Sequence, residues 1–144
     1  MSTVRSSHHR AAKADTIIED HTTVAMLVSV IPIPLAEFAA LSAVHMKMVE
    51  QLASLYKVEF KAHLAKAFIA SLLTAYVSTV AGIFAVGSIS KWVPGLGAMV
   101  GVVALAPLAG GLTYAMGRVF VWHFESGGTL SSLDQPKAQA TFRR

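Results

Sequence analysis

The sequence contains no cysteine and little charge. Without cysteine, neither a disulfide framework nor a thiolate metal site can form. Only 14% of the 144 residues are charged, whereas charged residues make up about a quarter of an ordinary soluble domain. Hydrophobic residues account for 54% of the chain. The length fits one domain, and the composition is too apolar for a typical soluble one.

Charge is absent from two long stretches, residues 67–89 and 96–117. Each stretch is long enough to cross a hydrocarbon core about 30 Å thick, which takes roughly 20 helical residues. A segment in lipid must be helical because its backbone groups have no water to bind. The link that contains Lys91, Trp92 and Pro94 leaves room for a tight reversal only. The sequence therefore predicts a transmembrane hairpin with spans at about 67–89 and 96–117.

The residues before the hairpin predict a tail and a first helix. Residues 1–15 are polar and predict a disordered tail. An apolar pattern starts at Thr16, with Asp15 or Thr16 as the N-cap and Glu19 completing a capping box. This helix ends at residues 31–34 (IPIP), because a residue that precedes proline disfavours the helical conformation. The first thirty positions lack the apolar core of a signal peptide, so none is expected.

A second, amphipathic helix is predicted over residues 35–56, followed by the hairpin. We expect this helix to lie on the membrane surface or to pack against the hairpin. The predicted fold class is all-α, with two N-terminal amphipathic or semi-buried helices and a two-helix transmembrane hairpin. The helical domain covers residues 16–128, and residues 129–144 form a polar tail. The apolar face of the second helix consists of Phe38, Leu41, His45, Met48, Val49, Leu52 and Tyr56.

Basic and aromatic residues predict the orientation of the hairpin. Three lysines precede the first span and Arg118 follows the second, whereas the link carries Lys91 alone. By the positive-inside rule both termini lie in the cytoplasm. Aromatic side chains are typical of the membrane interface. The lysines are Lys57, Lys61 and Lys66, and the aromatic residues expected at the interfaces are Trp92, Phe120, Trp122 and Phe124.

Two kinds of residue are candidates for helix packing. His45 lies in the middle of the apolar face of the second helix and is a candidate buried polar group. It either hydrogen-bonds to a neighbouring helix, which we favour, or serves as a proton-sensitive or ligand-contacting group. Gly97, Gly101 and Gly110 offer small surfaces that allow close helix approach in lipid. These glycines predict tight helix packing and a homo-oligomer.

The sequence offers no catalytic or metal-binding pattern. His21, His45 and His63 are separated by distances that fit no known ligand spacing. We therefore predict no enzyme activity, no metal and no cofactor. The formal charge of +4 is modest and the basic residues are scattered. Such a distribution favours anionic lipid headgroups over nucleic acid as a partner.

Four stretches of the sequence are distinctive: residues 31–38 (IPIPLAEF), 41–48 (LSAVHMKM), 52–60 (LASLYKVEF) and 113–129 (TYAMGRVFVWHFESGGT). They resemble the YcjF-like family, a bacterial domain of unknown function that is often fused to, or encoded near, small GTPases. The resemblance covers residues 16–133. It implies a helical domain associated with the bacterial inner membrane. The chain lacks the phosphate-binding Gly-x-x-x-x-Gly-Lys-Ser/Thr sequence of a GTPase. It departs from the family at His45, where glutamine is common, and at Lys57, where glycine is usual.

The residues after the second span form a candidate docking surface for a partner. It consists of Arg118, His123, Glu125, Gly127 and Gly128. Gly127 also suits a helix C-cap, and Arg118 can alternatively extend to lipid headgroups. The predicted function is a non-enzymatic membrane module that recruits or responds to a partner such as a GTPase. The alternatives are an oligomeric pore or transport subunit lined by Ser71, Thr74 and Ser78, and a soluble helical bundle that binds lipid.

Overall fold

The chain folds into four helices. The computed structural model describes residues 2–31, 34–87 and 96–134. The elements are α1 (Ser2–Val28), α2 (Pro34–Leu55), α3 (Ala62–Gly87), α4 (Leu96–Glu125) and the short 3-10 helix η2 (Leu130–Asp134). No strand occurs among these described residues. The all-α fold class predicted from the sequence is confirmed.

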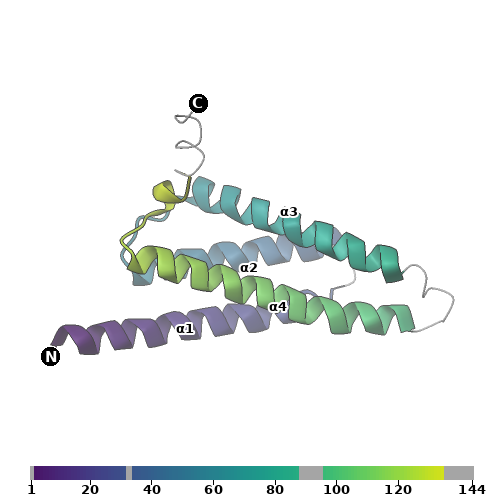
Figure 1. The fold of residues 1–144 in the computed structure, drawn as a ribbon, viewed down its shortest axis with the longest axis horizontal. Helices are drawn as coiled ribbons and strands as arrows, with labels where there is room; N and C mark the ends of the chain where they lie inside the picture. The colour runs from purple at the N-terminus through teal and green to yellow at the C-terminus, as the bar shows by residue number, and fades with distance from the viewer. Residues whose placement is uncertain (1, 32–33, 88–95, 135–144) are drawn as a thin grey trace.

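The four helices form an elongated antiparallel bundle (Figure 1). Helices α1 and α3 run in one direction along it, and α2 and α4 run in the other. We call one end, formed by residues 2–20, 46–66 and 113–134, the charged end. The opposite end, formed by residues 21–31, 34–45, 67–87 and 96–112, is the apolar end. Each helix therefore contributes one half to each end.

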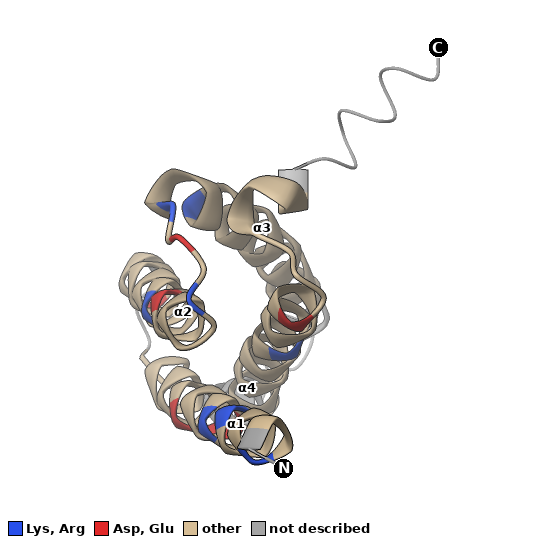
Figure 2. Ribbon diagram, turned by 90° about the vertical axis from the view of Figure 1, so that its left-hand side faces the viewer, with Lys and Arg blue, Asp and Glu red and all other residues tan. Residues whose placement is uncertain are grey.

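Charged residues are segregated along the bundle axis. Figure 2 views the charged end, where charged residues occur on all four helices. Among the described residues of the apolar end, Glu37 is the only Asp, Glu, Lys or Arg. The sequence predicts this lack of charge for α3 and α4. The second half of α1 and the first half of α2 also lack charge except at Glu37, and the antiparallel packing places them beside the uncharged parts of α3 and α4.

The core is built from one buried stripe on each helix. In α3 the buried residues Ala65, Ile69, Leu73 and Tyr76 recur every three or four positions, which places them on one face. The opposite stripe of α4 includes Phe120, which is fully buried and packs edge-to-face on Phe68 with ring centroids 5.2 Å apart. The predicted core face of α2 is confirmed for most of its members: Leu41, His45, Met48, Val49 and Leu52 are all buried.

Two of the aromatic residues predicted to lie at a membrane interface belong to the core instead. Phe120 is completely buried, and Phe124 is 5% exposed. They are four positions apart and therefore share the inward face of α4. Trp122 lies between them on the other face and is 70% exposed. Trp92 and the rest of the predicted reversal fall within residues 88–95, which are outside the described residues.

The prediction of a disordered tail over residues 1–15 is wrong, because α1 begins at Ser2. The segment is held by contacts with distant residues. Ala14 is completely buried, and Asp15 binds Arg118 of α4. Thr16 is no N-cap, since it lies inside α1 and its hydroxyl donates to the carbonyl of Ala12. The predicted helix was thus too short by its first half.

Helix α2 ends in a left-handed turn at Lys57, which has φ = 56°. The amide of Val58 donates to the carbonyl of Ala53 at 2.8 Å, as in a Schellman cap. A residue with a Cβ is strained in this conformation, whereas glycine is not. Glycine would therefore be less strained than lysine at position 57.

Two helices are long and apolar enough to cross a membrane, by length and composition alone. Within the described residues these stretches are Ala62–Gly82 and Val103–Glu125. They overlap the spans predicted at 67–89 and 96–117, although residues 88–89 are not described. Only 22% of the first stretch and 39% of the second are buried inside the bundle. A core helix of a soluble protein is mostly buried, and these two helices are not.

Glycines of α4 allow α1 to approach closely. A Cβ on Gly110 would lie 2.7 Å from the Met26 side chain, and one on Gly117 would lie 2.6 Å from Ile18. Gly110 was predicted as a packing residue, but Gly117 was not. Gly97 and Gly101 lie in the first turns of α4, and their surroundings are outside what the structure describes. Gly111 has no neighbour within 4 Å.

We expect Gly117→Ala to lower the free energy of unfolding by about 1–2 kcal/mol. A methyl group there overpacks the fully buried Ile18, and the better helix propensity of alanine offsets only part of this cost. Gly111→Ala is the matched control, because the same change meets open space and should be neutral or slightly stabilising. Thermal unfolding in detergent, followed by circular dichroism, compares the two. Equal effects would contradict the proposed close approach of α1 and α4.

Candidate functional site

His45 is a completely buried polar group at the centre of the bundle. Its Nε2 atom lies 2.8 Å from the Thr113 hydroxyl of α4, and that hydroxyl donates to the carbonyl of Ala109. Because Thr113 has a single hydroxyl proton, we assign the proton of the ring to Nε2, which donates to Thr113. Nδ1 is buried and has no partner among the described residues. His45 therefore joins α2 to α4 in its neutral form.

Burial and, to a smaller extent, the nearby charge of His21 lower the pKa of His45 to about 4. A second proton would have to reside on Nδ1, where the structure provides no acceptor. The imidazole is therefore uncharged at neutral pH. This arrangement favours a packing role for His45 and argues against a proton sensor that works near neutral pH.

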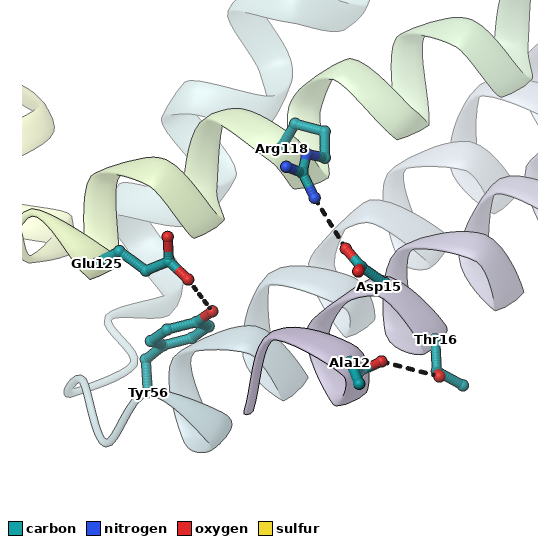
Figure 3. Close-up of polar contacts among 6 residues, drawn as sticks. All are labelled: Ala12, Asp15, Thr16, Tyr56, Arg118 and Glu125. Carbon is teal, nitrogen blue, oxygen red and sulfur yellow. Dashed lines mark hydrogen bonds and ion pairs between the residues drawn. The ribbon is translucent and has the colours of Figure 1, made fainter. Parts of the chain in front are cut away.

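Arg118 of α4 binds Asp15 of α1, with 2.8 Å between Nη1 and Oδ1 (Figure 3). Both side chains are about half exposed, so the pair contributes little to stability. Glu37, considered as an alternative partner of Arg118, lies at the apolar end. There it accepts a hydrogen bond of 3.1 Å from the Tyr76 hydroxyl of α3. Arg118 therefore pairs with α1 and not with Glu37 of α2.

Glu125 accepts a hydrogen bond from the hydroxyl of Tyr56, at 2.8 Å (Figure 3). The guanidinium of Arg10 lies 5.7 Å from the centre of the Tyr56 ring, within the range of a cation–π contact. Burial and the hydrogen bond to Glu125 raise the pKa of Tyr56 to about 12. Tyr56 thus connects α1, α2 and α4 at the charged end.

His123, Gly127 and Gly128 form the C-terminal cap of α4. Gly127 has φ = 80°, and the amide of Gly128 donates to the carbonyl of His123 at 2.9 Å. Nε2 of His123 lies 2.8 Å from the Thr129 carbonyl and 2.9 Å from the Ser132 hydroxyl. A Cβ on Gly128 would collide with the imidazole ring. These three residues therefore shape the turn that leads to η2.

The five residues predicted as one docking surface each make a contact within the chain. Arg118 pairs with Asp15 of α1, Glu125 binds Tyr56, and His123, Gly127 and Gly128 form the cap of α4. Sequence reasoning did not identify Asp15 and Tyr56 as partners of this surface, nor Arg10, which stacks on Tyr56. A cleft does lie nearby, between the first turns of α1 and the ends of α2 and α4. It is lined by Ser7, His8, Arg10, Ala11, Tyr56, Phe124 and Glu125.

The other candidate residues form no chemical site. Within the described part of the chain, no group of three or more His, Cys, Asp or Glu residues is arranged to hold a metal ion. The hydroxyls of Ser71, Thr74 and Ser78 donate to carbonyls of their own helix and lie on exposed residues of α3. A pore lined by them would therefore need several copies of the chain around it.

We expect His45→Ala to lower the free energy of unfolding by about 2–4 kcal/mol, because it removes a buried side chain and its hydrogen bond to Thr113. His45→Gln keeps an amide donor within reach of Thr113 and should cost about 1 kcal/mol. Thermal unfolding of both variants in detergent measures the difference. Equal losses would contradict the assigned hydrogen bond.

His45 should also make the stability of the protein depend on pH. The pKa of His45 is about 4 in the folded chain and 6.5 in the unfolded one, so the unfolded state binds more protons between these values. Stability is therefore full above pH 6.5 and falls by about 3 kcal/mol towards pH 4. His45→Gln should lack this component. An unchanged pH profile in that variant would contradict the lowered pKa.

Comparisons with known proteins place the chain among relatives. Its sequence is 37% identical over 131 residues to Magnetosome membrane protein 22 of Magnetospirillum gryphiswaldense. The aligned residues cover 91% of this chain and 67% of that relative. No solved structure matches the chain. Residues 3–144 match the family described as a domain of unknown function, DUF697. Since the match extends over nearly the whole sequence, the chain belongs to the DUF697 family.

Proposed function

We propose that this protein is a non-enzymatic membrane module whose α3–α4 hairpin crosses the bilayer. The observation that carries the proposal is the low burial of the two apolar stretches, 22% for Ala62–Gly82 and 39% for Val103–Glu125. Most residues of the first stretch, and more than a third of those of the second, are exposed in the bundle. In water such surface would be unfavourable by roughly 25 cal/mol per Å² of apolar area, whereas lipid tails accommodate it.

Two further observations support a membrane location. A relative of 37% identity is named a magnetosome membrane protein, and we extend its membrane location to this chain. The charges of the described residues gather at one end of the bundle, as expected for a protein with one end in water and one in lipid (Figure 2). From the basic residues beside the two spans, we infer that the charged end lies on the cytoplasmic side of the inner membrane.

The charged end is the proposed site of partner recruitment. The cleft beside Arg10 and Tyr56 lies there, with polar groups from α1, α2 and α4 at its surface. The resemblance to domains found with small GTPases favours a GTPase as the partner. Residues 1–144 contain no phosphate-binding loop, so the proposed GTPase lies outside this sequence.

The topology can be tested with single cysteines, since the native chain contains none. We expect Ser90→Cys, in the α3–α4 link, to react with a membrane-impermeant maleimide in intact cells. Ser7→Cys, at the charged end, should react only after lysis. Labelling at neither position before lysis would show that the hairpin does not cross. Labelling at Ser7 before lysis would invert the orientation.

Extraction and flux measurements separate the alternative functions. A soluble lipid-binding bundle would leave membranes in alkaline carbonate, whereas a spanning hairpin stays with the lipid. A pore built from several copies would conduct ions in proteoliposomes, and the proposed module would not. The small residues exposed on α3, among them Ser71 and Ser78, favour contact between copies in lipid without a conducting path.

Recruitment can be tested by photo-crosslinking in native cells. A benzophenone amino acid in place of His8, beside the cleft, should form an adduct with a GTP-binding protein identified by mass spectrometry. The same amino acid at Asp20 is the matched control, because this exposed residue is also on α1 but does not line the cleft. Adducts that are equal at both positions, or that contain only lipid, would contradict recruitment at this end.

A further inference from the structure

Large apolar side chains are exposed around the tip formed by the end of α1 and the start of α2. We call this group, consisting of Val24, Leu27, Val30, Ile31, Leu35 and Phe38, the α1–α2 tip. Leu27 is 69% exposed and Leu35 is 85% exposed. Single exposed apolar residues are ordinary on a soluble surface, but a contiguous group of this kind marks a contact with lipid or protein.

Two contacts fix the depth of this tip along the bundle. Met26, within the last turns of α1, packs on Gly110 near the middle of α4. Glu37, in the first turn of α2, binds the hydroxyl of Tyr76 in α3. Both partners belong to the two apolar stretches that are long enough to cross a membrane. The tip therefore lies beside the middle of the α3–α4 hairpin and not beside its ends, as Figure 1 shows.

Several polar groups at the end of α1 are paired within the helix. The amides of Ser29, Val30 and Ile31 all donate to carbonyls of α1. The hydroxyl of Ser29 donates to the Met26 carbonyl, and the residue itself is buried. Pro32 and Pro34 have no amide proton to satisfy. A chain reversal in lipid must hide its backbone polar groups, and this sequence limits how many there are.

We propose that the α1–α2 tip enters the acyl-chain region of the bilayer from the side of the charged end, as a re-entrant hairpin packed on α3 and α4. This inference rests on the proposed function, in which the α3–α4 hairpin spans the membrane. The uncharged part of α1, residues 21–28, is about 12 Å long at 1.5 Å per residue. That length is less than half of a hydrocarbon core, so the tip enters the bilayer without crossing it.

The depth of the tip can be measured by fluorescence quenching. The two native tryptophans are first removed by Trp92→Phe and Trp122→Phe. Single tryptophans are then introduced by Leu27→Trp and Leu35→Trp, one on each helix of the tip. The full chain is reconstituted into phosphatidylcholine–phosphatidylglycerol vesicles whose acyl chains are brominated near their middle. Both substituted positions are exposed, and circular dichroism verifies that each variant keeps its helix content.

Two control positions complete the design. Val103→Trp, on an exposed position of α4, reports whether the hairpin itself enters the lipid. Val4→Trp is the matched control for Leu27→Trp, because Val4 is also an exposed apolar residue of α1 but lies at the charged end. We expect losses of fluorescence at positions 27 and 35 as large as that at position 103, and little loss at position 4.

The outcomes distinguish this inference from the function on which it rests. Quenching at position 103 without quenching at positions 27 and 35 would overturn the re-entrant hairpin and leave the spanning hairpin intact. This result is also the one expected if a second copy of the chain covers the tip. An absence of quenching at all four positions would overturn the proposed membrane function together with the inference.

Discussion

The structure depends on one constraint: the bundle surrounds its two apolar helices only partly with protein. Each helix of the bundle buries a single stripe against the others, and the stripe of α3 is four residues, Ala65, Ile69, Leu73 and Tyr76, over most of its length. The remaining surface of α3 and α4 is uncharged beyond Lys66 and before Arg118. Lipid is the environment in which such surface carries no cost. The segregation of charge along the axis and the exposure of the α1–α2 tip both follow from this constraint.

Close contact between α1 and α4 determines how the two halves of the bundle are aligned. Gly110 and Gly117 face α1 and leave room for Met26 and Ile18. Asp15 binds Arg118, the residue that follows Gly117. Asp15 and Ile18 lie one turn apart on α1, and Met26 lies about two turns further on, so these contacts together fix the position of α1 along α4. His45 and Thr113 fix α2 against α4 in the same way. Polar and small residues thus specify the alignment, while the apolar stripes supply most of the buried area.

Sequence reasoning found the elements that are encoded locally. The uncharged runs identified α3 and α4, and helical periodicity identified the inward face of α2 with His45 on it. It failed where a distant residue decides the outcome. The first half of α1 looks like a polar tail until Arg118, 103 positions away, is placed beside Asp15. Arg118 and Glu125 of the predicted docking surface likewise bind partners on other helices. Gly117 differs from Gly111 only in facing Ile18, and no local pattern records this difference.

The beginning of α1 differs from the rest of the bundle in how it is held. Before Ala14 the described residues of α1 are exposed or half-buried, and the stacking of Arg10 on Tyr56 is the main side-chain contact with other helices. Local opening of a helix end requires little free energy when few apolar contacts are lost. Amide hydrogens there should exchange with solvent far faster than those after Ala14. The first three turns of α1 can therefore detach and rebind while the core around Phe120 stays folded, which would alternately cover and uncover the aromatic surface of Tyr56 and Phe124.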